Sequence, residues 1–217
     1  MLRRYGGKSA EERAAERRAQ LLEAGLELFG TLGYHGTSIR AVLREAGLGE
    51  RYFYESFESL EDLLMAVTAQ AQEELKLDIM RAIQQVEEPA LETILRAALT
   101  ALGRTITSDP RKLRITMVET IGLSPTVTEA RDRLLDDFVD LIVAAAVAYG
   151  NIPAAQAHVL ALGLLGATNE LLMRWATGGL DADLPTVIDN VELIYRGTYL
   201  LAAGLTGEPR EPSLPAD

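Results

Sequence analysis

The apolar residues of this 217-residue chain recur at intervals of three and four along almost its whole length. Such spacing places apolar side chains on one face of an α-helix, whereas a half-buried strand would require apolar and polar residues to alternate. Glycine, proline and small polar residues separate these segments and interrupt helices. The sequence therefore predicts an all-α fold with about nine helices.

Local signals predict where the first helices begin and end. Ser9 followed by Glu12 is a capping-box pattern that opens the first helix, and Gly33 is expected to end it. Thr37 is predicted to N-cap a second, short helix that stops at Gly47. The further helices are expected at residues 50–54, 59–86, 90–107, 111–121, 126–149, 154–177 and 186–205.

Charge is unevenly distributed along the chain. The net charge is −11, yet residues 1–58 contain 9 Lys+Arg and 9 Asp+Glu, while residues 59–217 contain 12 and 23. A neutral N-terminal region is compatible with DNA binding through a few well-placed charges. We expect an N-terminal domain at 1–58 with a flexible basic arm at 1–9, a second helical domain at 59–206, and a disordered tail at 207–217.

Several classes of protein are excluded. The chain has no cysteine, which excludes disulfides and thiolate zinc sites. A turn at Gly150–Pro153 breaks the longest uncharged stretch, so we expect no membrane span and a cytoplasmic protein. The histidines are His35 and His158, and no nucleophile elbow, phosphate loop or metal-ligand spacing accompanies them. We therefore expect no enzyme activity, no cofactor and no metal site.

The segment that joins the second and third predicted helices has the pattern of a helix-turn-helix. Ala46 is small enough for two helices to cross closely, Gly47 permits a positive φ, and Leu48 fills the small core between them. In this motif the second helix enters the major groove of DNA. The pattern indicates that this part of the chain binds double-stranded DNA.

Three blocks of this region resemble the tetracycline-repressor (TetR) family of bacterial regulators. They read Gly33-Tyr34-His35-Gly36-Thr37-Ser38-Ile39, Ala46-Gly47-Leu48 and Tyr52-Phe53-Tyr54-Glu55-Ser56-Phe57, within about residues 17–67. The resemblance implies a sequence-specific transcription regulator that binds a pseudo-palindromic operator as a homodimer. It further implies a repressor that a small, largely apolar effector releases from DNA.

The same resemblance assigns roles to single residues. Thr37, Ser38 and Tyr54 match family positions that contact phosphate, and the turn and third helix carry the recognition positions. The residues predicted to contact DNA are Thr37, Ser38, Arg40, Arg44, Gly49, Glu50, Arg51, Tyr52 and Tyr54.

Alternatives remain open for most of these positions. Arg51 either bridges the O6 and N7 acceptors of guanine or is a solvated or phosphate-binding arginine. Glu50 either reads cytosine or orients Arg51. Tyr54 contacts phosphate or packs on the fourth helix, and Arg40 and Arg44 follow a DNA strand or form a solvated face.

Two positions depart from the family pattern. Gly49 stands where serine or threonine is usual, and Leu60 stands where many members have a lysine that meets phosphate. Both departures remove possible DNA contacts. They keep an alternative function open, a helical small-molecule-binding protein that has lost DNA binding.

The C-terminal helices are expected to form a dimer interface and an effector pocket. Arg114 and Glu119 would supply polar contacts to the effector or lie at the surface. The predicted dimer residues are Val159, Gly163, Gly166, Ala167, Val187, Val191, Ile194 and Thr198. The predicted pocket residues, each of which could instead be simple core, are Met117, Ile121, Phe138, Met173 and Trp175.

Overall fold

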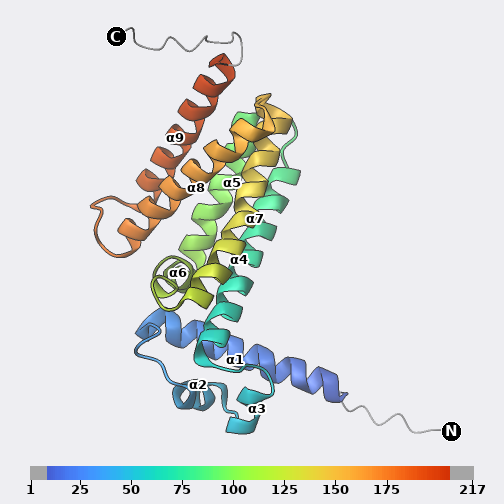
Figure 1. Cartoon of the computed structure of the whole chain (residues 1–217), viewed down its shortest axis with the longest axis vertical. Coiled ribbons are helices and arrows are strands. Elements are labelled where there is room, and N and C mark those ends of the chain that lie inside the picture. Colours follow the sequence, from blue (N-terminus) through green and yellow to red (C-terminus); the bar gives the residue numbers. More distant parts are fainter. Residues whose placement is uncertain (1–8, 206–217) are drawn as a thin grey trace, which may run out of the picture. The chain divides into compact units, whose positions relative to one another are not determined.

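The computed structural model describes residues 9–205, and every regular element in this range is a helix (Figure 1). The predicted all-α fold is confirmed. The tail at 207–217 and nearly all of the predicted basic arm lie outside the described residues. The elements are α1 (Ala10–Leu32), α2 (Ile39–Ala46), α3 (Glu50–Tyr54), α4 (Leu60–Gln84), α5 (Leu91–Ser108), α6 (Pro110–Arg114), the π-helix η1 (Ile115–Glu119), α7 (Pro125–Gly150), α8 (Ala154–Ala176) and α9 (Leu184–Leu205).

The two ends of α1 follow the predicted local signals. The Ser9 hydroxyl accepts the Glu12 N–H at 3.0 Å, and the Glu12 carboxylate accepts the Ser9 N–H at 2.6 Å, which completes the capping box. Gly33 ends the helix with φ 78°, a conformation that a residue with a Cβ rarely adopts. The first helix is therefore determined by its own sequence.

The N-cap of α2 is Ser38, which corrects the prediction of Thr37. The Ser38 hydroxyl accepts the Ala41 N–H at 3.3 Å. Thr37 is buried, and its hydroxyl donates to the Gly33 carbonyl at 2.8 Å. A turn closed by the Thr37 N–H and the Tyr34 carbonyl directs Thr37 inward, so this hydroxyl stabilises the loop before α2.

The segment predicted as one helix at 111–121 consists of two elements. Asp109 caps α6 and Pro110 occupies its first turn, but from Ile115 the backbone is a π-helix. The Thr116 hydroxyl donates to the Lys112 carbonyl at 2.9 Å, and such side-chain bonds to preceding carbonyls distort helices. π-Helical turns are rare and frequently occur at functional sites.

Contacts divide the chain into two compact units. Unit 1 comprises Met1–Glu74 and Ile106–Arg133, and unit 2 comprises Leu75–Thr105 and Leu134–Asp217. Both α4 and α7 continue from one unit into the other. The predicted domain boundary at residue 58 stays a prediction.

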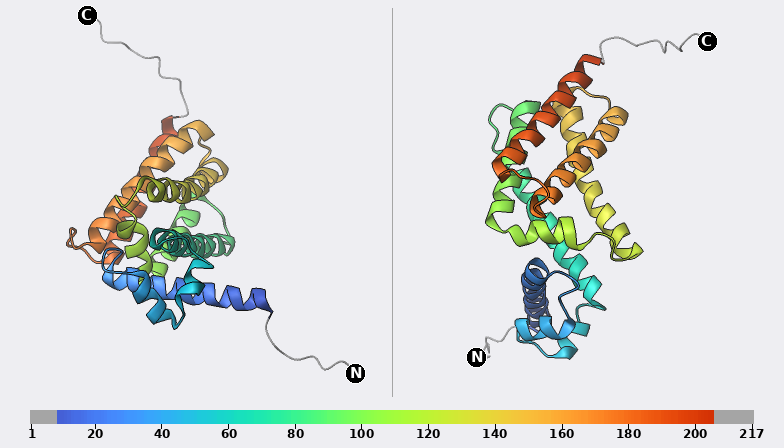
Figure 2. Two further views of the ribbon diagram at one scale, coloured as in Figure 1. Left: turned by 60° about the horizontal axis from the view of Figure 1, so that its bottom comes forward. Right: turned by 90° about the vertical axis from the view of Figure 1, so that its left-hand side faces the viewer.

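Each unit has its own apolar core. In unit 1 the aromatic rings of Phe29, Phe53 and Phe57 are buried among leucine and valine side chains of α1, α2 and α4. In unit 2, α8 and α9 lie side by side (Figure 2) and enclose the buried tyrosines Tyr195 and Tyr199. No helix among residues 9–205 is long and apolar enough to cross a membrane.

Candidate nucleic-acid interface

The turn between α2 and α3 has the geometry that the sequence predicts for a helix-turn-helix. Gly47 is left-handed with φ 66°, and the Leu48 N–H donates to the Leu43 carbonyl at 3.0 Å. Val42, Leu43 and Phe53 are buried in the core of unit 1. The core therefore fixes the inner faces of α2 and α3, while their outer faces are free to meet a partner.

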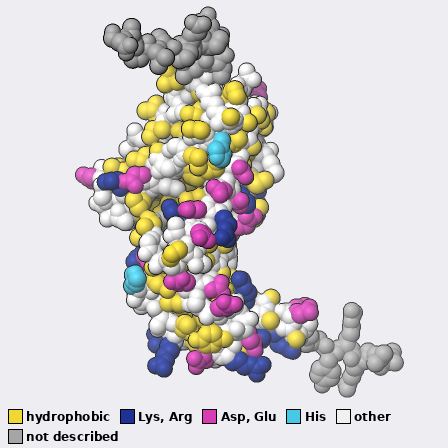
Figure 3. All heavy atoms as spheres, in the orientation of Figure 1, with side chains coloured by type: hydrophobic (Ala, Val, Ile, Leu, Met, Phe, Trp, Pro, Cys, Tyr) yellow, Lys and Arg dark blue, Asp and Glu magenta, His cyan; other side chains and the backbone are white. Residues whose placement is uncertain are grey.

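Eight of the nine predicted DNA-contacting residues are exposed on these outer faces, and Thr37 is the exception. Arginine side chains lie among acidic ones at the end of unit 1 that α2 and α3 form (Figure 3). Tyr54 is 56% exposed and packs edge-on against Phe53, with ring centroids 5.4 Å apart. The structure thus leaves eight of the predicted residues accessible on α2, α3 and the turns that precede these helices, and their contacts with DNA stay a prediction.

Arg51 belongs to a cluster that sequence reasoning did not identify. Its Nε–H donates to Glu55 at 2.9 Å, so Glu55, and not the suspected Glu50, is the carboxylate beside it. The other oxygen of Glu55 lies 3.4 Å from the Arg17 guanidinium, which also stacks 4.5 Å from the Tyr52 ring centroid. The i,i+4 spacing of Arg51 and Glu55 was a signal for their pairing, but the part of Arg17 depends on tertiary structure.

A second polar cluster holds the turn between α1 and α2. The Glu119 carboxylate accepts the Tyr34 N–H at 2.7 Å and the Arg114 Nε–H at 2.9 Å. Arg114 in turn donates to the Thr31 carbonyl at 3.0 Å, near the end of α1. Arg114 and Glu119 are thus engaged with the end of α1 and the loop before α2, and their predicted contacts with an effector stay a prediction.

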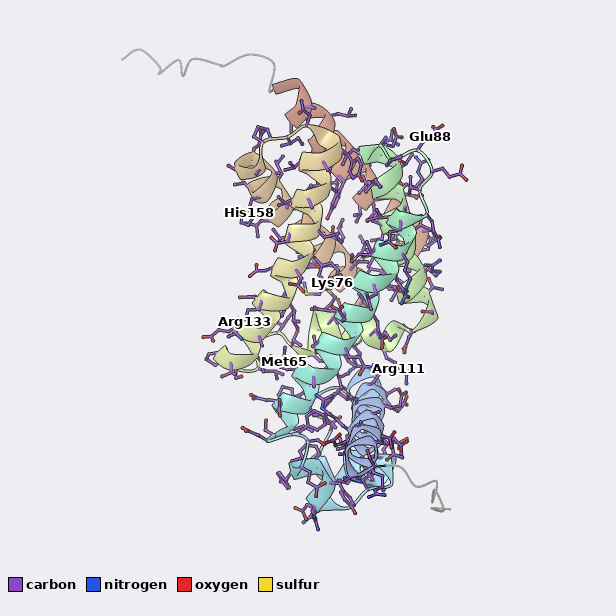
Figure 4. All side chains as sticks on the ribbon, turned by 90° about the vertical axis from the view of Figure 1, so that its right-hand side faces the viewer. Met65, Lys76, Glu88, Arg111, Arg133 and His158 are labelled. Carbon is purple, nitrogen blue, oxygen red and sulfur yellow. The ribbon has the colours of Figure 1, made fainter. Side chains whose placement is uncertain are left out.

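The packing of α6 against α1 is tight. A Cβ added to Gly30 would lie 2.5 Å from the Arg111 Cβ, so only glycine fits at this crossing. Arg111, labelled in Figure 4, donates to Glu27 of α1 at 2.6 Å and to both oxygens of Asp109 at 2.8 Å. These hydrogen bonds with Arg111 hold the pKa of Asp109 below its ordinary value.

Burial and hydrogen bonding shift the pKa values of other groups. Burial, with the nearby Glu61 carboxylate, raises the pKa of the Tyr34 phenol in unit 1. In unit 2, burial raises the pKa of Tyr195 more than the hydrogen bond with Thr168 lowers it. Burial also raises the pKa of Tyr199. None of these groups is thereby tuned to titrate near neutral pH, so they point to structural roles.

Unit 1 contains a cavity of about 280 Å³ between α1, α4 and α6. Apolar side chains such as Leu22, Leu26 and Val67 line it together with the paired Lys112 and Glu74, whose charged atoms lie 2.6 Å apart. The lining includes none of the residues predicted to bind an effector.

The structure does not gather the five predicted pocket residues in one unit. Met117 and Ile121 belong to unit 1, and Ile121 is 50% exposed. Phe138, Met173 and Trp175 belong to unit 2 and are half-buried. The effector-binding role of all five stays a prediction.

The residues predicted for a dimer interface fall into two groups. Val159, Gly163 and Gly166 of α8 are exposed along one side, with Ala167 beside them half-buried. On α9, Ile194 is exposed and Thr198 is half-buried.

Val187 and Val191 require a correction, since they are only 3% and 1% exposed and belong to the core of unit 2. The exposed side of α9 instead presents Leu193, Leu200 and Leu201, which are 67%, 72% and 71% exposed. Residues 193, 197, 200, 201 and 204 follow helical spacing, and a Cβ at Gly197 or Gly204 would meet open space. We use the name apolar face for the following residues of α8 and α9: Val159, Leu162, Gly163 and Gly166 of α8, and Leu193, Gly197, Leu200, Leu201 and Gly204 of α9.

Comparison with known proteins agrees with this geometry. Residues 21–67 match the model of bacterial regulatory proteins of the tetR family. The chain is 25% identical over 178 residues to the HTH-type transcriptional activator FasR of Mycolicibacterium smegmatis, which covers 80% of this chain and 78% of that protein.

Solved structures share the fold. A TetR-family regulator from Syntrophomonas wolfei has a TM-score of 0.73 at 18% identity, with 86% of this chain and 96% of that one covered. The regulator FadR from Bacillus subtilis, solved with stearoyl-CoA, has a TM-score of 0.68 at 15% identity, with 81% and 96% covered.

Proposed function

Since the chain belongs to the TetR family of transcription regulators, we propose that it binds a pseudo-palindromic operator as a homodimer and that an effector with a long acyl chain releases it. Its relatives are transcription regulators rather than enzymes, as the sequence predicts. DNA binding is the activity of the helix-turn-helix, and the dimer, the operator and the effector are the proposed parts.

The observation that carries DNA binding is the exposed outer surface of α2 and α3. Arg40, Arg44 and Arg51 supply positive charge, and Ser38 and Tyr54 supply hydroxyl groups for phosphate oxygens. Because α2 and α3 are held by the core of unit 1, these groups are ordered before DNA arrives.

The two departures from the family pattern do not remove this surface. Gly49 is the N-cap of α3 without a side-chain hydrogen bond, so one possible phosphate contact is absent. Leu60 packs against the core of unit 1, so its side chain stabilises the start of α4. The alternative function without DNA binding therefore has less support than the regulator.

The apolar face supports a homodimer. Large exposed leucines at helical spacing are unusual on a monomer and mark interaction sites. Glycines between the leucines would allow two helices to approach closely. An operator with two half-sites about 34–36 Å apart, or a multiple of that, would match the two-fold symmetry of such a dimer.

An acyl chain is proposed as the effector from two observations. FadR of Bacillus subtilis, which shares the fold, was solved with stearoyl-CoA, and FadR of Bacillus halodurans is a fatty acid degradation regulator with a TM-score of 0.69. The helices of unit 2 are predominantly apolar, and Phe138, Met173 and Trp175 are half-buried there. An apolar effector would bury its chain among such residues.

The expected sign of regulation is repression, as the family resemblance implies, and an effector that prefers the DNA-free conformation would relieve it by weakening operator binding. Activation is the second candidate, because the relative FasR is an activator. A reporter gene downstream of the selected operator separates them. Deleting the regulator raises expression for a repressor and lowers it for an activator.

The first experiment selects random duplexes with the purified protein and titrates the enriched duplex with wild type and Tyr54→Phe. Loss of one hydrogen bond to a charged phosphate should weaken binding about tenfold, uniformly across sequences. Tyr149→Phe, at a tyrosine of α7 that is 44% exposed, is the matched control and should bind like wild type.

The effector is tested on the same operator with stearoyl-CoA and with free coenzyme A. Release by stearoyl-CoA alone supports an acyl effector. Equal responses to both, or no response to either, would reject the acyl chain as the recognised group. Failure of the wild type to enrich any duplex at low salt would reject the regulator itself.

A further inference from the structure

Arg51 is linked to the rigid part of unit 1 through Glu55. One oxygen of the Glu55 carboxylate accepts the Arg51 Nε–H at 2.9 Å, and the other lies 3.4 Å from Nη2 of Arg17. Arg17 belongs to the long helix α1 and stacks on the ring of Tyr52, 4.5 Å from its centroid. The carboxylate of Glu55, the C-cap residue of α3, is thus held by two arginines, Arg51 on α3 and Arg17 on α1.

The exposure of these side chains shows which of them are packed against the protein and which one is accessible to DNA. Arg17 is 24% exposed and Glu55 37%, whereas Arg51 is 85% exposed. An isolated ion pair at this spacing contributes little, because both side chains lose freedom to form it. Here the ring of Tyr52 restricts Arg17 and Arg17 in turn restricts Glu55, so Glu55 can orient Arg51 at a lower entropic cost.

The atom of Arg51 that Glu55 binds determines which N–H donors of the guanidinium remain available. This group presents five N–H donors in one plane. Because Glu55 takes the Nε–H, the two terminal nitrogens remain as a fork on the outer side of Arg51. A fork of this kind matches the O6 and N7 acceptors of guanine in the major groove.

The charge beside Arg51 favours a base over a phosphate as its partner. The Glu55 carboxylate is in direct contact with Arg51. This carboxylate offsets the positive charge that would attract a phosphate, whereas a neutral base edge depends on donor direction more than on net charge. Of the roles that the sequence leaves open for Arg51, recognition of guanine is therefore favoured over binding of phosphate.

We propose that Glu55 is a positioning residue for base recognition: held by Arg17, it orients Arg51 so that its terminal nitrogens read a guanine in each half-site. This inference rests on the proposed DNA-binding function and adds to it the residue that sets base preference. It has an unusual consequence. Loss of the Glu55 carboxylate should reduce discrimination between sequences while overall attraction to DNA stays the same or rises, because a negative charge leaves the interface.

The test uses the full-length protein, the duplex selected by wild type, and a series of duplexes with each base pair replaced in turn. Arg51→Ala should lower discrimination at one G·C pair per half-site by about 5- to 150-fold, the range of one bidentate contact. Glu55→Ala should lower discrimination at that same pair by about threefold or more and leave the other pairs unchanged. Glu55→Gln, which keeps an acceptor for Nε without the charge, should lie between Glu55→Ala and wild type.

Glu58→Ala is the matched control, since it removes the same charge from an exposed glutamate three residues away. It should change affinity for all duplexes equally and leave discrimination at every pair as in wild type. A merely structural role of Glu55 would instead weaken binding to all duplexes by one factor and lower the melting temperature.

The outcomes separate this inference from the proposed function. If wild type selects a duplex but Glu55→Ala keeps full discrimination at the pair that Arg51→Ala affects, the positioning role is overturned and DNA binding stands. If Arg51→Ala alters discrimination at no pair, Arg51 reads no base and the inference also fails. If wild type selects no duplex, the proposed function fails first.

Discussion

In unit 1, charged side chains reach across to the backbone at the ends of other helices, whereas in unit 2 the helices pack through apolar side chains and tyrosines. Glu119 and Arg114 bind the N–H and carbonyl groups around the end of α1. The core of unit 2 contains Tyr195, whose phenol oxygen accepts a hydrogen bond from Thr168 at 3.2 Å. Arginine–glutamate pairs of unit 2, such as Arg96 with Glu192, involve an arginine side chain that is 60% exposed.

This difference shows what kind of surface each unit has to hold in place. A DNA-reading surface requires a short turn and two short helices to be held in one geometry, and short helices have little stability of their own. Directed hydrogen bonds to backbone groups supply that geometry. Unit 2 leaves an apolar face exposed on α8 and α9, and such a face requires area and shape rather than directed bonds.

The largest effect is expected from a substitution in the core of unit 1, which should lower the free energy of unfolding. Phe53→Ala removes a ring that is 0% exposed and lies 5.9 Å from the ring of Phe57. We expect a loss of about 3–5 kcal/mol in the free energy of unfolding, with loss of operator binding. Urea unfolding monitored by circular dichroism measures it.

The matched variant in unit 2 is Leu172→Ala, at a residue that is 1% exposed. It should destabilise by about 2–5 kcal/mol. If unit 1 alone fixes the reading surface, whatever protein remains folded should still bind the operator. If both variants lose DNA binding equally under conditions where both are folded, unit 1 is not the only part of the chain that fixes the DNA-reading surface.

The next effect concerns the apolar face. Leu200→Glu places a charge at a leucine that is 72% exposed in the single chain. If a second copy covers this face, the buried charge should weaken the dimer by about 2 kcal/mol or more, a rise of roughly 30-fold in its dissociation constant. Sedimentation equilibrium provides the measurement.

Leu77→Glu is its control, since Leu77 is an exposed leucine on α4, away from the apolar face, and 40% exposed. This variant should remain as dimeric as wild type. A dimer dissociation constant that is unchanged by Leu200→Glu, or raised equally by both variants, would show that the apolar face is not the interface.

The smallest effect tests the polar cluster that holds the turn. Glu119→Ala leaves the Tyr34 N–H and the Arg114 Nε–H without their acceptor, and Glu119 is only 10% exposed. We expect a loss of about 1–2 kcal/mol in unfolding free energy. Operator binding should also weaken, because the loop before α2 loses its hydrogen bond to Glu119. Parallel denaturation and DNA titration measure both.

Glu129→Ala is the control for this change, because Glu129 is 70% exposed and pairs with Arg133 on the same helix. Its removal should cost less than about 0.5 kcal/mol. If the Glu119 variant is as stable as this control, the cluster does not hold the turn, and the contrast between the units loses its main support.

The sequence by itself determined the features that depend on local chemistry. Ser9 with Glu12, Gly33 and Gly47 set helix ends through hydrogen bonds and positive φ angles that involve only nearby residues. The helix-turn-helix followed from the same short-range pattern, whereas the residues predicted to contact DNA came from the family resemblance and stay a prediction. For such features the neighbours along the chain are also the physical partners.

Tertiary structure alone decided the features whose partners are distant in sequence. Val187 and Val191 were indistinguishable from interface residues by spacing, because a helix has more than one apolar side, and only packing in unit 2 buries them. Glu119 and Tyr34 are 85 residues apart, and Arg17 and Glu55 are 38 apart. Side chains on separate helices meet only when the core has set the positions of those helices, so no pattern along the chain could reveal these contacts.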